Sequence, residues 1–144
     1  MTLEEALEDP ERRRAVIAGS AALVEAEVAR KRGFSGAAIR TGFVSVKRLM
    51  PTFVPRALER LMPEFAPAID PLYARARESG DVERWFTAHA GEIADALLAV
   101  TDARAVRADQ PVLLKVYRTL RGRARGHVME AAPGLARLVL EHVP

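Results

Sequence analysis

Prolines place the strongest constraint on how this chain can fold, because five of its nine prolines lie between residues 51 and 71. A proline has no backbone N–H and clashes with the preceding helical turn, so inside a helix it costs about 3 kcal/mol relative to alanine. Four of the five belong to a phrase that nearly repeats, Arg48–Pro55 (RLMPTFVP) and Arg60–Pro67 (RLMPEFAP). We interpret the two copies as similar helix corners, with one helix ending at Met50 and a short helix, 56–62, ending at the second.

Pro63, Pro67 and Pro71 follow one another at a spacing of four residues, so on a helix they would share one face. A straight helix through all three is not expected, because each proline removes a backbone hydrogen bond. The pattern predicts a bent or interrupted segment that runs to about Ser79.

The rest of the chain has the apolar spacing of helices and no stretch that alternates apolar and polar residues, so we expect no β-strands. Helix starts are predicted at four caps: Thr2 with Glu5, Asp9 before Pro10, Ser35, and Asp81. Gly33 predicts the end of the helix that Pro10 begins, and Pro133 with Gly134 predicts a break before a short terminal helix. The prediction is an all-α fold: a single compact helical bundle of six to eight helices with proline-marked corners, forming one domain over residues 1–144.

The composition is that of a globular protein, with 49% hydrophobic and 28% charged residues. The chain has no cysteine, which excludes disulfides, thiolate metal ligands and a cysteine nucleophile. Its first residues lack the apolar segment of a signal peptide, and no uncharged run approaches the ~20 apolar residues of a membrane span. We expect a soluble, cytoplasmic protein.

Motifs for catalysis and metal binding are absent from the sequence. Its three histidines, His89, His127 and His142, stand outside any HExxH or Glu-x-x-His pattern, so we predict no metal site and no cofactor. No serine lies in a Gly-x-Ser-x-Gly motif, and the stretch 33–42 (GFSGAAIRTG) lacks the Gly-Lys-Ser/Thr end of a phosphate-binding loop. We therefore expect no catalytic residues, and an enzyme is the least favoured class of function.

A first candidate anion site lies where Ser35 and Gly36 would open a helix, because free N–H groups at a helix start attract anions. Four basic residues are close by in the sequence: Arg30, Lys31, Arg32 and Arg40. The alternative is a pair of ordinary helix caps beside a solvated basic end, since basic residues at a helix C-terminus already complement its dipole.

A second candidate is the arginine-rich helix expected over residues 112–131, whose apolar spacing predicts a buried side made by Leu113, Tyr117, Leu120 and Ala124. The basic residues then project outward or to the flanks of the outward side: Lys115, Arg118, Arg121, Arg123 and Arg125. Gly122 and Gly126 share that side, where missing side chains would let an anionic partner or a second helix approach closely. The alternative is a solvated basic face without a partner.

A third candidate is an apolar pocket near the repeated phrase, lined by Met50, Phe53, Met62, Phe65 and Trp85. Methionine and aromatic side chains are adaptable groups that line ligand pockets. They also fill the gaps at helix corners, because a domain of this size needs apolar residues to close its core. Both interpretations stay open.

Four phrases of the chain carry a resemblance to a known family: GFSGAAIRTG (33–42), RLMPTFVPRALERLMPEF (48–65), VTDARA (100–105) and LRGRARGHV (120–128). Together they resemble a small bacterial family of uncharacterised helical proteins, a domain of unknown function. The likeness spans nearly the whole chain. It implies a single helical domain, and no activity, cofactor or catalytic residue can be transferred from it to this chain.

The favoured hypothesis is a non-enzymatic cytosolic binding or scaffolding module. It would engage an anionic partner, a nucleic acid or an acidic membrane surface, through the arginine-rich helix face, and a protein partner is also open. The alternative is a carrier of a small apolar ligand, held in a pocket inside the bundle.

Overall fold

The structure, a computed structural model, describes residues 1–107, 109 and 111–144, without the side chains of Phe34, Ser35, Val112, Leu113 and Val116. Over those residues it contains seven helices and no strand, which confirms the expected all-α fold. The helices are α1 (Leu3–Ala6), α2 (Pro10–Arg30), α3 (Gly33–Leu49), α4 (Phe53–Ser79), α5 (Val82–Ala88), α6 (Ala90–Val106) and α7 (Pro111–His142).

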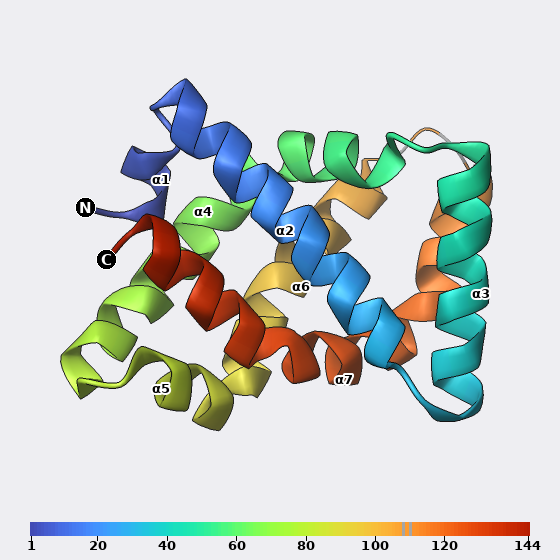
Figure 1. Cartoon of the computed structure of the whole chain (residues 1–144). Coiled ribbons are helices and arrows are strands. Elements are labelled where there is room, and N and C mark those ends of the chain that lie inside the picture. Colours follow the sequence, from blue (N-terminus) through green and yellow to red (C-terminus); the bar gives the residue numbers. More distant parts are fainter. Residues whose placement is uncertain (108, 110) are drawn as a thin grey trace.

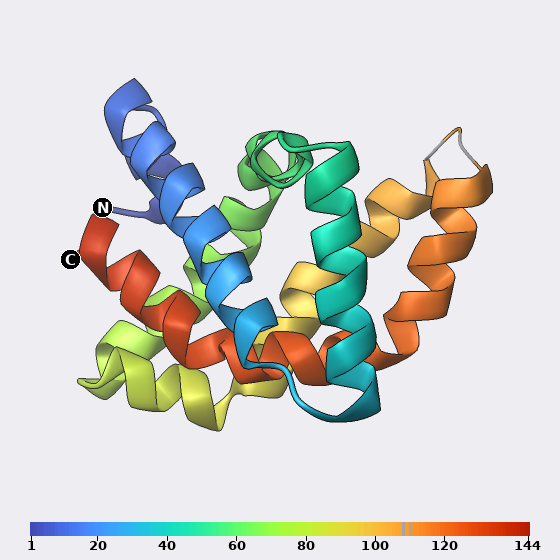
Figure 2. The ribbon, with the colours of Figure 1, turned by 45° about the vertical axis from the view of Figure 1, so that its right-hand side comes forward.

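Two helices, α2 and the C-terminal half of α7, run antiparallel and side by side across one face of the molecule (Figure 1). Behind them α4 packs against α6, and α5 packs against α7. The largest fully buried side chains lie where α4, α5, α6 and α7 meet: Tyr73, Phe86, Ile69, Ile93, Val139 and Val143. Helix α3 stands at one edge, mainly in contact with α2 and α4, and apart from the N-terminal half of α7 (Figure 2).

Both ends of the chain are held on α4. The carboxylate of Asp70 accepts hydrogen bonds from the backbone N–H groups of Leu3 (2.7 Å) and Glu4 (3.0 Å), at the start of α1. Near the other end, the Tyr73 hydroxyl and the Arg77 guanidinium donate to the carbonyl oxygen of Val143. The two termini therefore lie close together on the same side of the bundle (Figure 1).

Three of the four predicted caps are confirmed. Thr2 forms the capping box of α1, Asp9 caps α2 with Pro10 in its first turn, and Asp81 caps α5. The prediction at Ser35 is wrong, because α3 already begins at Gly33, and the side chain of Ser35 lies outside the described part. Gly33 has a φ of +74°, a left-handed conformation that a glycine adopts without strain and that turns the chain into the helix.

The first proline corner is confirmed, and the second is wrong. Helix α3 ends at Leu49 and the chain turns at Met50–Thr52, but α4 then continues through Pro63, Pro67 and Pro71 to Ser79 as one curved helix (Figure 1). All three prolines are on the exposed face of α4. The carbonyl groups that lose an N–H partner there can hydrogen bond to water, which reduces the free-energy cost of each proline. The opposite face of α4 stays packed against the core.

The break predicted at Pro133 and Gly134 is also wrong, because α7 runs without interruption to His142. Gly134 is buried against α2, and a Cβ atom on it would lie 2.5 Å from Cδ1 of Leu23. The same half of α7 buries Ala132, Ala136 and Val139 in the core. Packing on both sides of Pro133 therefore outweighs the one hydrogen bond that this proline cannot make.

Candidate functional site: an apolar cavity and a basic helix face

A cavity of about 360 Å³ lies inside the bundle, between α2, α4, α6 and α7, with Ile39 of α3 among its lining residues. An apolar cavity of about 150 Å³ is enough to hold benzene, and small-molecule sites span about 300–1,000 Å³. Most of its wall consists of aliphatic carbon, from Val16, Leu23, Val24, Val28, Leu58, Met62, Ile69, Leu97, Leu98, Val128, Ala131, Leu135 and Leu138. The arrangement provides room for a small apolar molecule.

The crossing of α2 and α7 forms one side of this cavity. A Cβ atom on Gly19 of α2 would lie 2.6 Å from Cδ1 of Leu138, and one on Gly134 of α7 would lie 2.5 Å from Cδ1 of Leu23. A leucine of the other helix therefore packs against each glycine. The two helices approach closely at this crossing, and the same two leucines reach the cavity wall.

Polar residues near the Lys31 end of the cavity are bonded to one another. Lys31 is only 5% exposed, and its Nζ donates to Oε2 of Glu130 at 2.7 Å and lies 3.8 Å from Oε2 of Glu27. The hydrogen bond from Lys31 holds the pKa of the Glu130 carboxyl below its ordinary value. The ammonium group is therefore occupied by carboxylates of the protein, while the residue contributes to the cavity wall.

Ser20 of α2 also lines the cavity, and its side chain is 9% exposed. Serine and threonine hydroxyls inside a helix commonly bond to the carbonyl four residues earlier, as Ser45 and Thr87 do here. Ser20 makes no hydrogen bond to any residue that the structure describes. No sequence pattern distinguishes Ser20, since a lone serine in a helix belongs to no motif.

The five residues predicted to form one apolar pocket are divided among three places. Met62 and Phe65 line the cavity. Met50 and Phe53 lie instead at a separate shallow groove beside Arg56, Arg60 and Arg104. Trp85 stacks on His89, with ring centroids 3.9 Å apart, and the Arg75 guanidinium lies over it. The structure thus brings Met62 and Phe65 to one cavity and places Met50, Phe53 and Trp85 elsewhere, and their role in binding a ligand stays a prediction.

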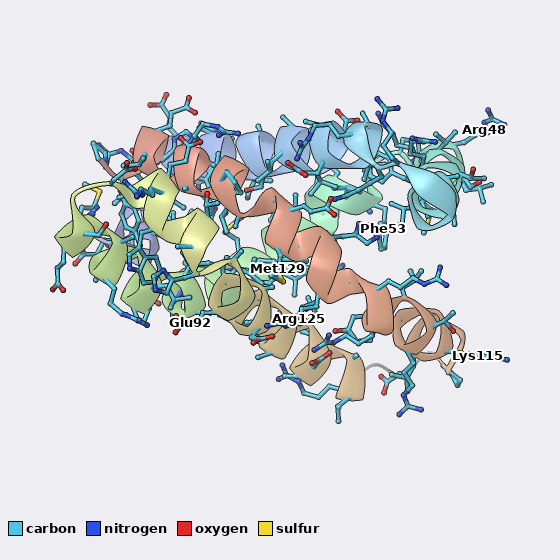
Figure 3. The ribbon with its side chains drawn as sticks, turned by 90° about the horizontal axis from the view of Figure 1, so that it is seen from below. Arg48, Phe53, Glu92, Lys115, Arg125 and Met129 are labelled. Atoms are coloured by element: carbon cyan, nitrogen blue, oxygen red, sulfur yellow. The ribbon has the colours of Figure 1, made fainter. Side chains whose placement is uncertain are left out.

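The predicted outward face of α7 is rotated in the structure. Arg121 donates to both carboxylate oxygens of Asp102 (2.9 and 3.1 Å), and Arg125 donates to both oxygens of Asp95 (2.8 and 3.4 Å). Both aspartates belong to α6, so Arg125 does not project away from the bundle (Figure 3). Leu120, expected to be buried, is 55% exposed, and the side chain of Leu113 lies outside the described part.

Tyr117 joins the contact between α6 and α7. Its hydroxyl donates to Asp102 and lies 2.7 Å from the Thr101 hydroxyl. The pKa of Asp102 is lowered first by the hydrogen bond from Arg121 and then by that from Tyr117. Burial, followed by the bond to Asp102, raises the pKa of Tyr117. These hydrogen bonds connect α6 to α7.

Three basic residues of α7 remain exposed and make no ion pair with any residue in the described part of the chain: Lys115, Arg118 and Arg123. We call them the α7 basic row. Gly122 and Gly126 are exposed on the same helix, and Cβ atoms added to them would meet nothing within 4 Å. The two premises of the close-approach hypothesis, a continuous helix and outward glycines, are therefore met.

A family model matches residues 3–143 of the chain. The chain belongs to DUF6918, a family of unknown function. The resemblance noted in the sequence is thereby confirmed. No curated protein and no solved structure matches it. Membership of DUF6918 assigns no activity to this chain. Hypotheses about its function therefore depend on the geometry of the cavity and of the basic helix face.

In this member of DUF6918, several residues of the anion site predicted at the start of α3 have partners or neighbours within the protein. Arg30 pairs with Glu27 (2.6 Å), and Arg40 donates to the carbonyl oxygen of Lys31. Gly36 is buried against the chain itself, since its Cβ position lies 2.6 Å from the carbonyl carbon of Lys31. Arg32 is exposed. The backbone of Lys31 therefore lies directly against the first turn of α3 at Gly36, and the anion site stays a prediction.

Among the described residues, no group of three or more histidine or acidic side chains is placed to hold a metal ion. No helix within the same residues has the length and apolar character needed to cross a membrane.

Proposed function

We propose that this protein is a non-enzymatic, cytosolic binding protein that carries or senses one small apolar molecule in the cavity between α2, α4, α6 and α7. The single observation that supports the proposal is the cavity itself, about 360 Å³ of space with an almost wholly apolar wall. If benzene needs a cavity of about 150 Å³, this one suits a molecule of about 14 non-hydrogen atoms.

Energetics favour an occupant. Where an apolar cavity is enclosed, its unfilled volume costs about 24 cal/mol per Å³; this space is partly open to solvent, so only its enclosed part carries such a cost. The total free energy of unfolding of a domain is only about 5–15 kcal/mol. A bound molecule recovers part of this cost, because a ligand that binds only the folded state stabilises it by mass action.

The chemistry of the wall supports binding over catalysis. The charged groups near the cavity, Lys31 and Glu27, are paired within the protein, and Thr101 is bonded to Tyr117 and to the carbonyl of Leu98. A site of this kind selects its occupant by size and apolar character.

The test is titration of the native protein with N-phenyl-1-naphthylamine, a neutral dye whose fluorescence rises in apolar surroundings. We expect saturable binding of one dye per chain, an increase in the melting temperature, and displacement by medium-chain hydrocarbons. A dye signal that rises linearly without saturation, with no change in melting temperature, would refute the proposal.

A second candidate is the anionic partner expected from the sequence. The observation that favours it is the α7 basic row, three cations on one exposed stretch that are not neutralised by described carboxylates. Lys115 lies toward the N-terminal end of α7, away from the contact between Arg125 and α6 (Figure 3). The pairing of Arg121 and Arg125 with α6 makes this surface smaller than the sequence suggested.

A further inference from the structure

The cavity has one polar feature that its proposed role as an apolar site does not use. Ser20 is nine-tenths buried, lines the cavity, and makes no hydrogen bond within the described part of the chain. Its oxygen is not among the fully buried polar atoms that lack a partner, so it can be reached from the cavity or from solvent. Alanine would be the better helix former at this position.

Two other polar residues on the wall, Lys31 and Thr101, differ from Ser20, because their polar atoms are bonded to protein groups. Lys31 bonds to Glu130 and to the backbone carbonyl of His127, and it pairs with Glu27. Thr101 bonds to the Leu98 carbonyl and to Tyr117. A charged ligand group would therefore find the Lys31 ammonium already paired, and a carboxylate would meet the negative charge of Glu27.

The shape of the cavity indicates where a polar atom of a ligand would lie. Its wall on α2 extends from Val16 to Lys31, which at 1.5 Å per residue is a length of about 22 Å. A volume of about 360 Å³ spread over that length is narrow and suits a linear chain. Ser20 lies one helical turn from the Val16 end, so it faces a point near one end of such a chain.

We infer that the molecule bound in the cavity is a neutral, linear, medium-chain compound with a single oxygen near one end, a hydroxyl or a carbonyl group, that hydrogen bonds to Ser20. This inference rests on the proposed function and names its ligand class. The serine hydroxyl can donate to a carbonyl oxygen or accept from a hydroxyl group, so alcohols, aldehydes and methyl ketones fit. Saturated hydrocarbons fill the same space without that bond, and ionised fatty acids bring a charge that Lys31, already paired with Glu27 and Glu130, does not neutralise.

The experiment compares 1-dodecanol with n-tridecane, two linear molecules with the same number of non-hydrogen atoms, in dye displacement on the native protein and on Ser20→Ala. We expect the substitution to weaken 1-dodecanol by about 3- to 10-fold, the contribution of one hydrogen bond, and to leave n-tridecane unchanged or slightly tighter. The matched control is Ser45→Ala on the exposed side of α3, which is expected to change neither. Dodecanoate at neutral pH is expected to bind more weakly than 1-dodecanol.

The outcomes separate the two proposals. If neither 1-dodecanol nor n-tridecane binds the native protein, the proposed function fails. If both bind and Ser20→Ala changes them equally or not at all, the cavity is a binding site and the inference about the oxygen is overturned. Dodecanoate that binds as tightly as 1-dodecanol would overturn the neutral ligand class. The Ser20→Ala protein is expected to fold normally, because the change removes a hydroxyl that has no protein partner, and its melting temperature checks this.

Discussion

Ala131 of α7 lines the cavity, and replacing it with phenylalanine places a ring inside the space that the ligand is proposed to use. By the benzene comparison the ring fills about 150 Å³, or about two fifths of the cavity. At about 24 cal/mol per Å³ this is worth up to about 3.6 kcal/mol, from which a strain of about 1–3 kcal/mol must be subtracted for imperfect fit. We expect a net stabilisation of about 1–2 kcal/mol.

The assays are thermal unfolding and dye titration of Ala131→Phe. A gain of about 1–2 kcal/mol corresponds to a rise of about 3–7 °C in melting temperature for a chain of this length. The same ring is expected to weaken N-phenyl-1-naphthylamine binding at least 10-fold. The matched control is Ala74→Phe, at an exposed position of α4 that does not line the cavity, for which neither quantity should change much.

The combination of results decides the matter. A large loss of stability in Ala131→Phe would mean that the space is already closed by side chains, and the cavity argument would then be wrong. Unchanged dye affinity together with raised stability would place the dye somewhere else on the protein. Only a simultaneous gain in stability and loss of binding agrees with a cavity that serves as the ligand site.

Three further predictions concern the surface. The folded-state pKa of Asp102 is depressed, so the contribution of this carboxylate to stability is present above the ordinary aspartate pKa and is lost as pH falls through the folded value. Below about pH 4, the Asp102→Asn protein should therefore lose less stability on acidification than the native protein or a Glu78→Gln control. Urea unfolding at several pH values measures this difference. Replacing Gly122 and Gly126 together with alanine should raise the free energy of unfolding by about 1 kcal/mol per site. Gly36→Ala should instead lower the free energy of unfolding, because the new Cβ would meet the backbone of Lys31. Unchanged stability in the double variant and in Gly36→Ala would contradict this account of the glycines. Substituting the α7 basic row with alanine should weaken binding to acidic vesicles or duplex DNA and flatten its salt dependence, and an unaltered salt slope would exclude this surface as the contact.

Local sequence signals correctly predict three of the seven helix starts in the described part of the chain. The caps at Thr2, Asp9 and Asp81 depend on side chains that bond to nearby backbone N–H groups, so a few residues contain all the information. The errors at Met62 and Pro133 have a different origin. There the local cost of proline is small compared with the packing of the surrounding helix, and a sequence window does not show which face of a proline-bearing helix will be buried.

The face of α7 was assigned from its apolar residues alone, and that is why Arg125 was placed outward. Asp95 and Asp102 stand seven residues apart, two turns of α6, and Arg125 and Arg121 stand one turn apart on α7. In an antiparallel pair of helices this order allows two ion pairs, as the structure shows. The signal was present in the sequence, but using it requires knowing that α6 and α7 are neighbours.

The cavity was only partly predictable for a physical reason. Met62 and Phe65 were recognised as apolar residues at helical spacing, but the same pattern describes side chains that pack tightly and side chains that border a void. The difference lies in whether the opposite wall is filled. Aromatic residues are only 6% of this chain, and two of the largest buried side chains, Tyr73 and Phe86, pack against each other on α4 and α5.

The α2–α6 side of the bundle is left to aliphatic residues such as Leu23, Val24, Leu97 and Leu98. These side chains leave the space between α2, α4, α6 and α7 open. A single Ala→Phe change would supply much of the volume needed to close it. The cavity together with Ser20, which is nine-tenths buried and makes no hydrogen bond within the described part of the chain, is the combination from which we infer an occupant with both an apolar chain and one hydrogen-bonding oxygen.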